Sequence, residues 1–200
     1  MSLAPTWFST LWAGWSFSIM MQSLFAFLLL CMFLLKSSDI GAFIKGQQFH
    51  DIGKLLYGFS IFYAYLTFAH VLTYWYINMP EETSYFLTRL EKPWLYLVLV
   101  SPVLNFLFPL FIMIPKSSKF NPKVYIPISV LILVSQWLNY VLIVIPEVTT
   151  ASTWKIPWLE FGIMCGFTGL FLSAFFRFSS RNPMLSIGDP LLHQSFQDSH

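Results

Sequence analysis

The chain has 200 residues, of which 56% are hydrophobic and 20% aromatic, whereas only 10% are charged. A typical soluble domain is about 25% charged, so the composition argues against a soluble protein, and a net charge of +2 is too small to indicate nucleic-acid binding. The charged residues leave five long apolar stretches, each close to the 20 or so residues that cross a bilayer as a helix. The sequence therefore predicts an all-α membrane bundle of five transmembrane helices.

The five predicted spans lie roughly at residues 11–35, 55–78, 94–114, 124–145 and 157–176. We expect them to form one bundle over residues 1–181, followed by a C-terminal tail over residues 182–200. The first span is not a signal peptide, because no basic segment precedes it and its apolar run is too long.

A charged pair stands just before the second span. Asp51 and Lys54 are three residues apart, so we expect them to pair on the surface of a helix. Asp51 is also expected in the first turn, where a negative charge complements the helix dipole. The pair fits either a capped helix start with a snorkelling lysine or an entry point for protons.

The second span carries a file of polar side chains: Ser60, Tyr63, Thr67, His70, Tyr74 and Asn78. At 100° per residue they fall in a stripe about 80° wide that rises about 27 Å along the helix. Such a stripe can pass protons or hydrogen-bond a quinone headgroup, and an intramembrane histidine is a functional candidate by default. The alternative is that the stripe faces the bundle interior and bonds backbone carbonyls and neighbouring side chains.

The other spans contain fewer polar groups. Their amides are expected to hold helices together through hydrogen bonds: Gln22, Asn105, Gln136 and Asn139. Pro102 and Pro109 should bend the third span and free backbone carbonyls for side chains or water. In the fifth span, small residues on one face should allow close approach of another helix: Gly162, Gly166, Gly169 and Ser173.

The basic residues are distributed unequally between the two sides of the predicted bundle. One side holds eight: Lys36, Lys45, Lys54, Lys116, Lys119, Lys123, Arg177 and Arg181. The other holds three, which are Arg89, Lys92 and Lys155. The positive-inside rule then places the N-terminus outside and the C-terminus in the cytoplasm. Tryptophans at the outer helix ends are expected to form an interfacial aromatic belt: Trp7, Trp12, Trp94, Trp154 and Trp158.

The sequence offers no ligand set for a metal or a haem. Two cysteines cannot hold an iron–sulfur cluster, and His70 is the only histidine expected deep in the membrane. Nucleotide-binding and zinc motifs are absent. We therefore expect no metal site, no firm catalytic residue and no redox centre within this chain.

Several short motifs are similar to those of a known family. They are Pro5–Thr10, His50–Leu56 (HDIGKLL), Phe62–Tyr65, Trp75–Thr83 (WYINMPEET) followed by Tyr85 and Phe86, and Asp189–Leu191. These segments resemble the NrfD-like (polysulfide-reductase type) membrane subunits and, among them, the F subunit of alternative complex III, a bacterial quinol:cytochrome c oxidoreductase. Such subunits are about twice this length, so the chain resembles the C-terminal half only.

The resemblance implies a multi-pass accessory subunit of the bacterial inner (cytoplasmic) membrane, which contributes to quinol interaction or to proton conduction. Quinol or menaquinol would be the substrate of the whole complex. Implied partners are membrane lipid, a multihaem cytochrome, an iron–sulfur protein, a paralogous NrfD-like subunit and the N-terminal half. The alternative is a scaffold subunit that anchors the peripheral haem and iron–sulfur subunits through the outer Glu81–Arg89 loop, with Glu81, Glu82 and Arg89 as contact candidates.

Overall fold

The computed structural model describes residues 7–37, 41, 44–92, 94–148 and 158–182. The chain divides into two compact units, residues 1–154 and residues 155–200, which are described separately. All regular structure in the described residues is helical, and five helices are long and apolar enough to cross a membrane. The predicted fold class, an all-α multi-pass membrane protein, is confirmed.

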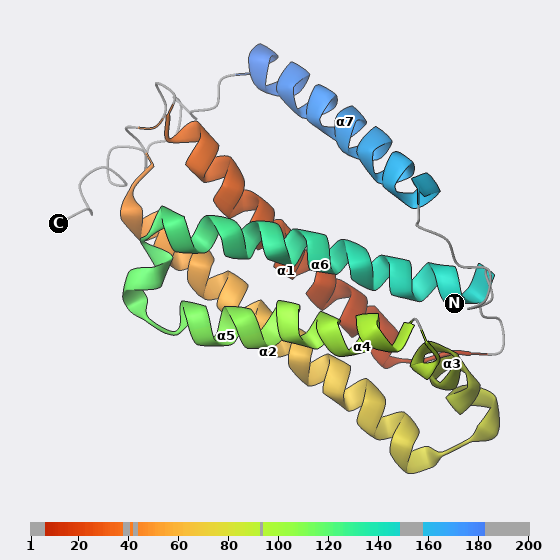
Figure 1. Cartoon of the computed structure of the whole chain (residues 1–200). Helices are drawn as coiled ribbons and strands as arrows, with labels where there is room; N and C mark the ends of the chain where they lie inside the picture. Colours follow the sequence, from red (N-terminus) through yellow and green to blue (C-terminus); the bar gives the residue numbers. More distant parts are fainter. Residues whose placement is uncertain (1–6, 38–40, 42–43, 93, 149–157, 183–200) are drawn as a thin grey trace. The chain divides into compact units, whose positions relative to one another are not determined.

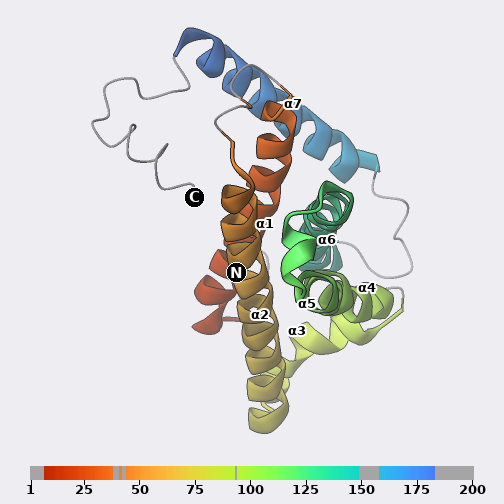
Figure 2. The same ribbon diagram turned by 90° about the vertical axis from the view of Figure 1, so that its left-hand side faces the viewer.

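The first unit contains four of the long helices (Figure 1). They are α1 (Leu11–Leu35), α2 (Gly46–Ile77), the segment Trp94–Met113, and α6 (Pro122–Val148). The segment Trp94–Met113 consists of α4 (Trp94–Pro102), a π-helical turn η2 (Val103–Leu107) and α5 (Phe108–Met113). Two short elements connect the long helices, namely α3 (Pro80–Leu90) and the 3₁₀ turn η3 (Lys116–Lys119). Helix α1 packs along α2 and α6, and α4 packs along α6 (Figure 2).

Helix α2 begins nine residues earlier than the predicted span, at Gly46 instead of Leu55. The side chain of Gln48 accepts a hydrogen bond from the backbone N–H of Lys45, the residue that caps the helix, at 3.2 Å. Phe49 and His50 are buried in this first part of the helix. The expectation that Asp51 lies in the first turn is therefore wrong. Hydropathy marks only the apolar part of a helix, so it misses a polar extension.

The third long segment is irregular because of its prolines. In an α-helix the carbonyl of Asn105 would accept the N–H of residue 109, but Pro109 has no N–H. The Asn105 carbonyl instead accepts a hydrogen bond from the Gln22 side chain of α1, with an N–O distance of 2.8 Å. The prediction that the prolines free a carbonyl for a side chain is confirmed.

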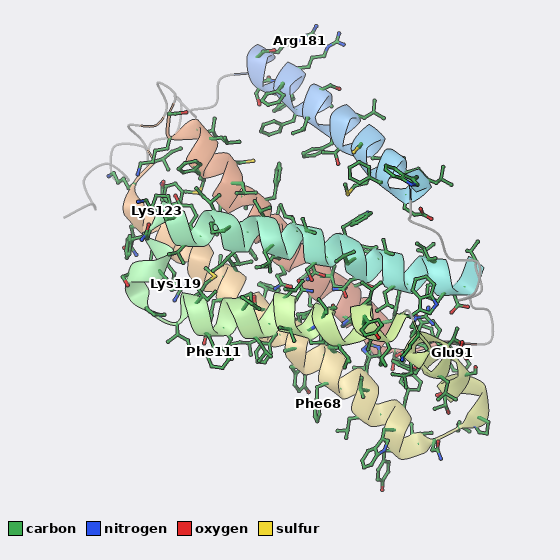
Figure 3. The ribbon with its side chains drawn as sticks, in the orientation of Figure 1. Phe68, Glu91, Phe111, Lys119, Lys123 and Arg181 are labelled. Atoms are coloured by element: carbon green, nitrogen blue, oxygen red, sulfur yellow. The ribbon has the colours of Figure 1, made fainter. Side chains whose placement is uncertain are left out.

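The interior of the first unit is apolar toward both ends. A cluster at one end joins α1, α2, α5 and α6: Ala26, Leu29, Phe49, Leu56, Met113, Tyr125, Ile128 and Ile132. At the other end Trp7 and Tyr74 pack with residues of α1 and α3. On the outside, Phe68 and Phe111 are 64% and 67% exposed (Figure 3). Exposed apolar side chains on long apolar helices are consistent with contact to membrane lipid.

The second unit contains one long helix, α7 (Trp158–Arg181), which has no buried residue. A methyl group added at Gly162, Gly166 or Gly169 would meet nothing within 4 Å. The predicted close approach of another helix to this face thus stays a prediction. Residues 183–200, which make up nearly all of the predicted tail, lie outside the described residues, as do Trp154 and Lys155.

Candidate functional site

A layer of buried amides and hydroxyls crosses the first unit between its apolar ends. Gln22 of α1 is its centre. The Gln22 amide nitrogen donates to the Ser60 hydroxyl of α2 at 2.9 Å and to the Asn105 carbonyl, and its amide oxygen accepts a hydrogen bond from Gln136 of α6. The predicted role of these amides in joining helices is confirmed.

The layer continues through Asn139 of α6. The Asn139 amide nitrogen donates to the Gln136 side-chain oxygen at 2.7 Å and to the Tyr63 hydroxyl at 3.1 Å. The Tyr63 hydroxyl lies 3.0 Å from the Ser101 hydroxyl of α4, which in turn donates to Asn139. Gln22, Tyr63 and Asn139 are at most 3% exposed, so the layer is closed to lipid.

A cavity of about 420 Å³ borders this layer. Tyr63, Ser101 and Asn139 of the layer line it, together with aromatic side chains from the segment before α1 and from α1, α2 and α3: Trp7, Trp12, Trp15, Tyr74, Trp75, Tyr85 and Phe86. Ligand pockets generally have volumes of about 300–1,000 Å³ and combine mostly apolar walls with a few polar groups. The size and lining of this cavity suit an aromatic ligand that carries one or two polar atoms.

His70 also lines the cavity and is 6% exposed. Its Nδ1 lies 3.2 Å from the Leu66 carbonyl, and its Nε2 lies 3.1 Å from the Ser9 hydroxyl. Because a carbonyl oxygen only accepts, Nδ1 must carry the proton, which leaves Nε2 as an acceptor in the neutral imidazole. For the neutral imidazole the hydrogen bonds therefore assign the Nδ1–H tautomer, in which the lone pair of Nε2 faces the Ser9 hydroxyl.

Trp7 contributes a hydrogen-bond donor to the cavity wall, whereas Nε2 of His70 contributes an acceptor. It is 3% exposed, stacks on Tyr85 with ring centroids 3.9 Å apart, and lines the cavity. Its indole N–H is buried and has no hydrogen-bond partner among the described residues. The prediction that Trp7 and Trp94 belong to an interfacial belt is wrong, because both are buried inside the unit. They look interfacial in sequence only because they lie at the ends of apolar stretches.

The rest of the polar stripe on α2 is bonded within the chain. Thr67 accepts a hydrogen bond from Trp15 at 3.0 Å and donates to the Tyr63 carbonyl. Tyr74 donates to the Phe8 carbonyl at 3.2 Å. Asn78 is exposed and ends α2 in a left-handed conformation with φ of 49°, so it lies outside the site. The prediction that the stripe faces the bundle interior is thus confirmed for the residues before Asn78.

The connection after α2 is a helix, α3, instead of the expected loop, and Pro80 occupies its first turn. Arg89 of α3 is 5% exposed, and its guanidinium donates to Glu147 at 2.9 Å and to the Leu142 carbonyl at 3.2 Å. Arg89 also lies over the Tyr85 ring at 3.4 Å. Arg89 is therefore engaged within the chain, and of the other two contact candidates Glu82 is half-buried and the side chain of Glu81 lies outside the described residues.

Asp51 and Lys54 form the predicted ion pair, with an N–O distance of 2.9 Å. The pair lies near the start of α2, whereas His70 lies about 24 Å further along the helix than Lys54 and about 28 Å further than Asp51, given a rise of about 1.5 Å per residue. Among the described residues, no side-chain hydrogen bond joins Asp51 or Lys54 to the polar layer. The structure thus separates these two candidates, and Asn78, from the other five, which belong to the polar layer or line the cavity.

No group of three His, Cys, Asp or Glu side chains that could hold a metal ion occurs in the described part of the chain. Sequence reasoning missed three contributors to the site, which are Ser9, Trp15 and Ser135. Nothing in the sequence around these residues marks them, because each contributes through a hydrogen bond to a distant residue. Ser9 bonds to His70, Trp15 to Thr67 and Ser135 to Asn105.

The chain matches no family model and no curated protein. The resemblance to NrfD-like subunits, which depends on short motifs, therefore stays a prediction.

Proposed function

We propose that this chain is an integral membrane subunit of a respiratory quinol:cytochrome c oxidoreductase of the alternative complex III type, in the inner membrane of a bacterium. In this proposal the chain holds a quinol headgroup in the aromatic cavity beside His70. The observation that carries the proposal is the pairing in one cavity wall of an acceptor nitrogen on His70, which is held only by the Ser9 hydroxyl, and an indole N–H on Trp7 that has no partner among the described residues.

A quinol hydroxyl both donates and accepts a hydrogen bond. It would donate to Nε2 of His70, in exchange for the Ser9 hydroxyl that occupies this nitrogen, and an oxygen of the headgroup would accept the Trp7 N–H. The flat ring would lie among tryptophan and tyrosine rings, which favour offset-stacked or edge-on contacts. The chain would bind and orient the headgroup, and the redox centres would belong to partner subunits.

The same geometry favours quinol interaction over proton conduction. The polar layer consists of amides and of hydroxyls, which do not titrate near neutral pH. Within the part of the chain that the structure describes, His70 is the one imidazole that lines the cavity, and no side-chain hydrogen bond links the Asp51–Lys54 pair to it. We therefore assign proton acceptance from quinol to His70 and a structural role to the layer.

A scaffold role is the second candidate. It is favoured by two exposed aromatic side chains near the end of α2: Trp75, which also lines the cavity, and Tyr76 are 76% and 84% exposed. Peripheral haem and iron–sulfur subunits would dock against surfaces of this kind, and the polar stripe would serve packing alone. This role needs no ligand in the cavity, so a binding measurement separates the two candidates.

The first prediction concerns His70→Phe. The purified full chain in mild detergent is titrated with decylubiquinol and with a short-chain menaquinol, and quenching of tryptophan fluorescence is measured, since four tryptophans line the cavity. The loss of one hydrogen bond should weaken binding roughly three- to tenfold. Trp7→Phe should have a similar effect because it keeps the ring but removes the donor.

His70→Gln and Thr73→Val serve as comparisons. Glutamine keeps a hydrogen-bond acceptor, so it should retain part of the affinity. Thr73 is exposed, does not line the cavity and donates to the Ala69 carbonyl of its own helix, so its change should have no effect. In the assembled complex, His70→Phe should slow quinol-dependent cytochrome reduction. Unchanged binding and turnover in this variant would contradict the quinol role, and a chain that purifies without a multihaem cytochrome would contradict membership of the complex.

A further inference from the structure

A second group of polar side chains lies at the end of the first unit away from the cavity. It consists of His50 and Lys54 on α2 and Lys119 on η3. Figure 3 shows Lys119 and Lys123 at this end and Glu91 at the opposite end. None of the three residues lines the cavity, so they have no part in the proposed quinol site.

Lys119 is unusually buried for a lysine, with 8% of its surface exposed. Its aliphatic stem packs on Gly53, where an added methyl group would lie 3.2 Å from the Lys119 Cγ. Its ammonium lies 5.2 Å from the centre of the Tyr57 ring, and no carboxylate pairs with it among the described residues. Burial lowers the pKa of Lys119, and the charge of Lys54 lowers it further. Because most of the Lys119 side chain is buried and no carboxylate lies beside it, an anion bound at its ammonium would be favoured.

Lys54 and His50 lie on α2 near Lys119. Few acidic groups lie near these three residues. Lys54 pairs with Asp51, which also accepts a hydrogen bond from Gln47 at 3.1 Å. His50 is 7% exposed, stacks on Phe120, and has a buried Nδ1 without a hydrogen-bond partner among the described residues. The distance from Nδ1 to the Asp51 carboxylate is 3.6 Å, which is too long for a hydrogen bond. Asp51 thus pairs with Lys54, while Lys119 has no carboxylate partner and Nδ1 of His50 has no hydrogen-bond partner among the described residues.

We propose that Lys119, Lys54 and Nδ1 of His50 bind the phosphate group of an anionic membrane lipid. Ammonium groups and an imidazole N–H donate to phosphate oxygens in strong, charge-assisted hydrogen bonds. The lipid source follows from the neighbours of the cluster: Leu55, Ile114 and Phe120 are apolar and 48%, 56% and 41% exposed. They offer a surface for acyl chains beside a basic headgroup site at the end of the apolar spans.

The test uses the full chain purified in an uncharged detergent. Its unfolding midpoint is measured while dioctanoyl phosphatidylglycerol, dioctanoyl phosphatidylcholine or sodium phosphate is added, because a ligand of the folded state raises the midpoint. Phosphatidylglycerol should raise it the most. Lys119→Met and Lys54→Met should each weaken the apparent affinity about five- to tenfold. Lys123→Met removes an exposed lysine at the same end and should have no effect.

One further variant, and the exposure of Lys54, protect the test against misfolding. Lys119→Arg keeps the charge and should keep most of the binding, and Lys54 is exposed enough for its methionine variant to fold normally. Equal losses in Lys123→Met and Lys119→Met would overturn the proposal in favour of diffuse surface attraction. A sodium phosphate effect as large as that of phosphatidylglycerol would overturn the lipid assignment. A response to phosphatidylglycerol that is unchanged in Lys119→Met and Lys54→Met would overturn the site itself.

Discussion

Two prolines create hydrogen bonds between helices, because each lacks the backbone N–H that a carbonyl of its own helix would otherwise bind. Pro109 leaves the Asn105 carbonyl to the Gln22 side chain, and Pro146 leaves the Leu142 carbonyl to Arg89. In both cases a side chain from another helix takes the carbonyl that the helix itself cannot use. A single proline in each case thereby leads to a hydrogen bond between helices. One of these bonds lies within the polar layer and the other beside the cavity.

The buried phenol of Tyr85 allows a test of how a single side chain affects stability. Burial raises the pKa of its phenol to about 12, although the charge of Arg89 opposes the rise. The unfolded chain would ionise this phenol near pH 10 while the folded chain still holds its proton, so the stabilisation is present below about pH 10 and is lost as the pH rises toward 12. We expect Tyr85→Phe to remove this part of the alkaline loss in unfolding free energy.

The measurement is detergent unfolding at several pH values between about 8 and 12, compared between the wild type and the variant. Tyr76→Phe is the matched control, because Tyr76 is 84% exposed and its side chain is not packed in the interior of the unit. If the wild type and Tyr85→Phe lose stability in parallel across this window, the phenol is not held in its neutral form as the structure implies.

Among the elements, α1 depends most on the polar layer for its position. Gln22 is fully buried on α1 and bonds to α2, η2 and α6 at once. In a membrane, lipid tails are as apolar as leucine, so burial of apolar surface gives little drive for helix association and interhelical hydrogen bonds matter more. The layer therefore specifies which faces of the helices meet.

Gln22→Leu should destabilise the first unit by about 1–2 kcal/mol, because it leaves Gln136 and the Asn105 carbonyl without their partner. Ser23→Ala is the matched change at the next position, where the hydroxyl bonds only the Ile19 carbonyl of its own helix. It should cost only a few tenths of a kcal/mol. Unfolding in mixed micelles measures both, and equal costs would mean that the layer contributes no specific stability.

For the whole molecule, the sequence was sufficient to predict the five long helices, since long uncharged stretches have few other structures in a lipid environment. It also predicted which face of α2 is buried, because helical periodicity fixes which residues share a face. The Asp51–Lys54 pair followed from spacing alone. These features depend on residues close together in the chain.

The features that could not be predicted depend on residues far apart. The cavity forms where Trp7, α2 and α3 meet, and the partners Ser9 and His70 are 61 residues apart. Helix α3 was mistaken for a loop because its polar residues resemble a connection, although Pro80 begins a helix and Arg89 anchors its other end on α6. Periodicity carries no information on which helix lies opposite, so tertiary partners require the structure.

The orientation of the molecule in the membrane is predicted by its charge distribution. Among the described residues, Lys36, Lys45, Lys54, Lys119 and Lys123 belong to the helix ends and turns at one end of the first unit, whereas Arg89 and Lys92 belong to the other end. The positive-inside rule places the lysine-rich end in the cytoplasm, and five spans place the C-terminus on that side too. A reporter enzyme that is active only outside the cytoplasm should be silent after His200 and active at Ser84. The reverse pattern would overturn this orientation and would place the proposed lipid site in the outer leaflet.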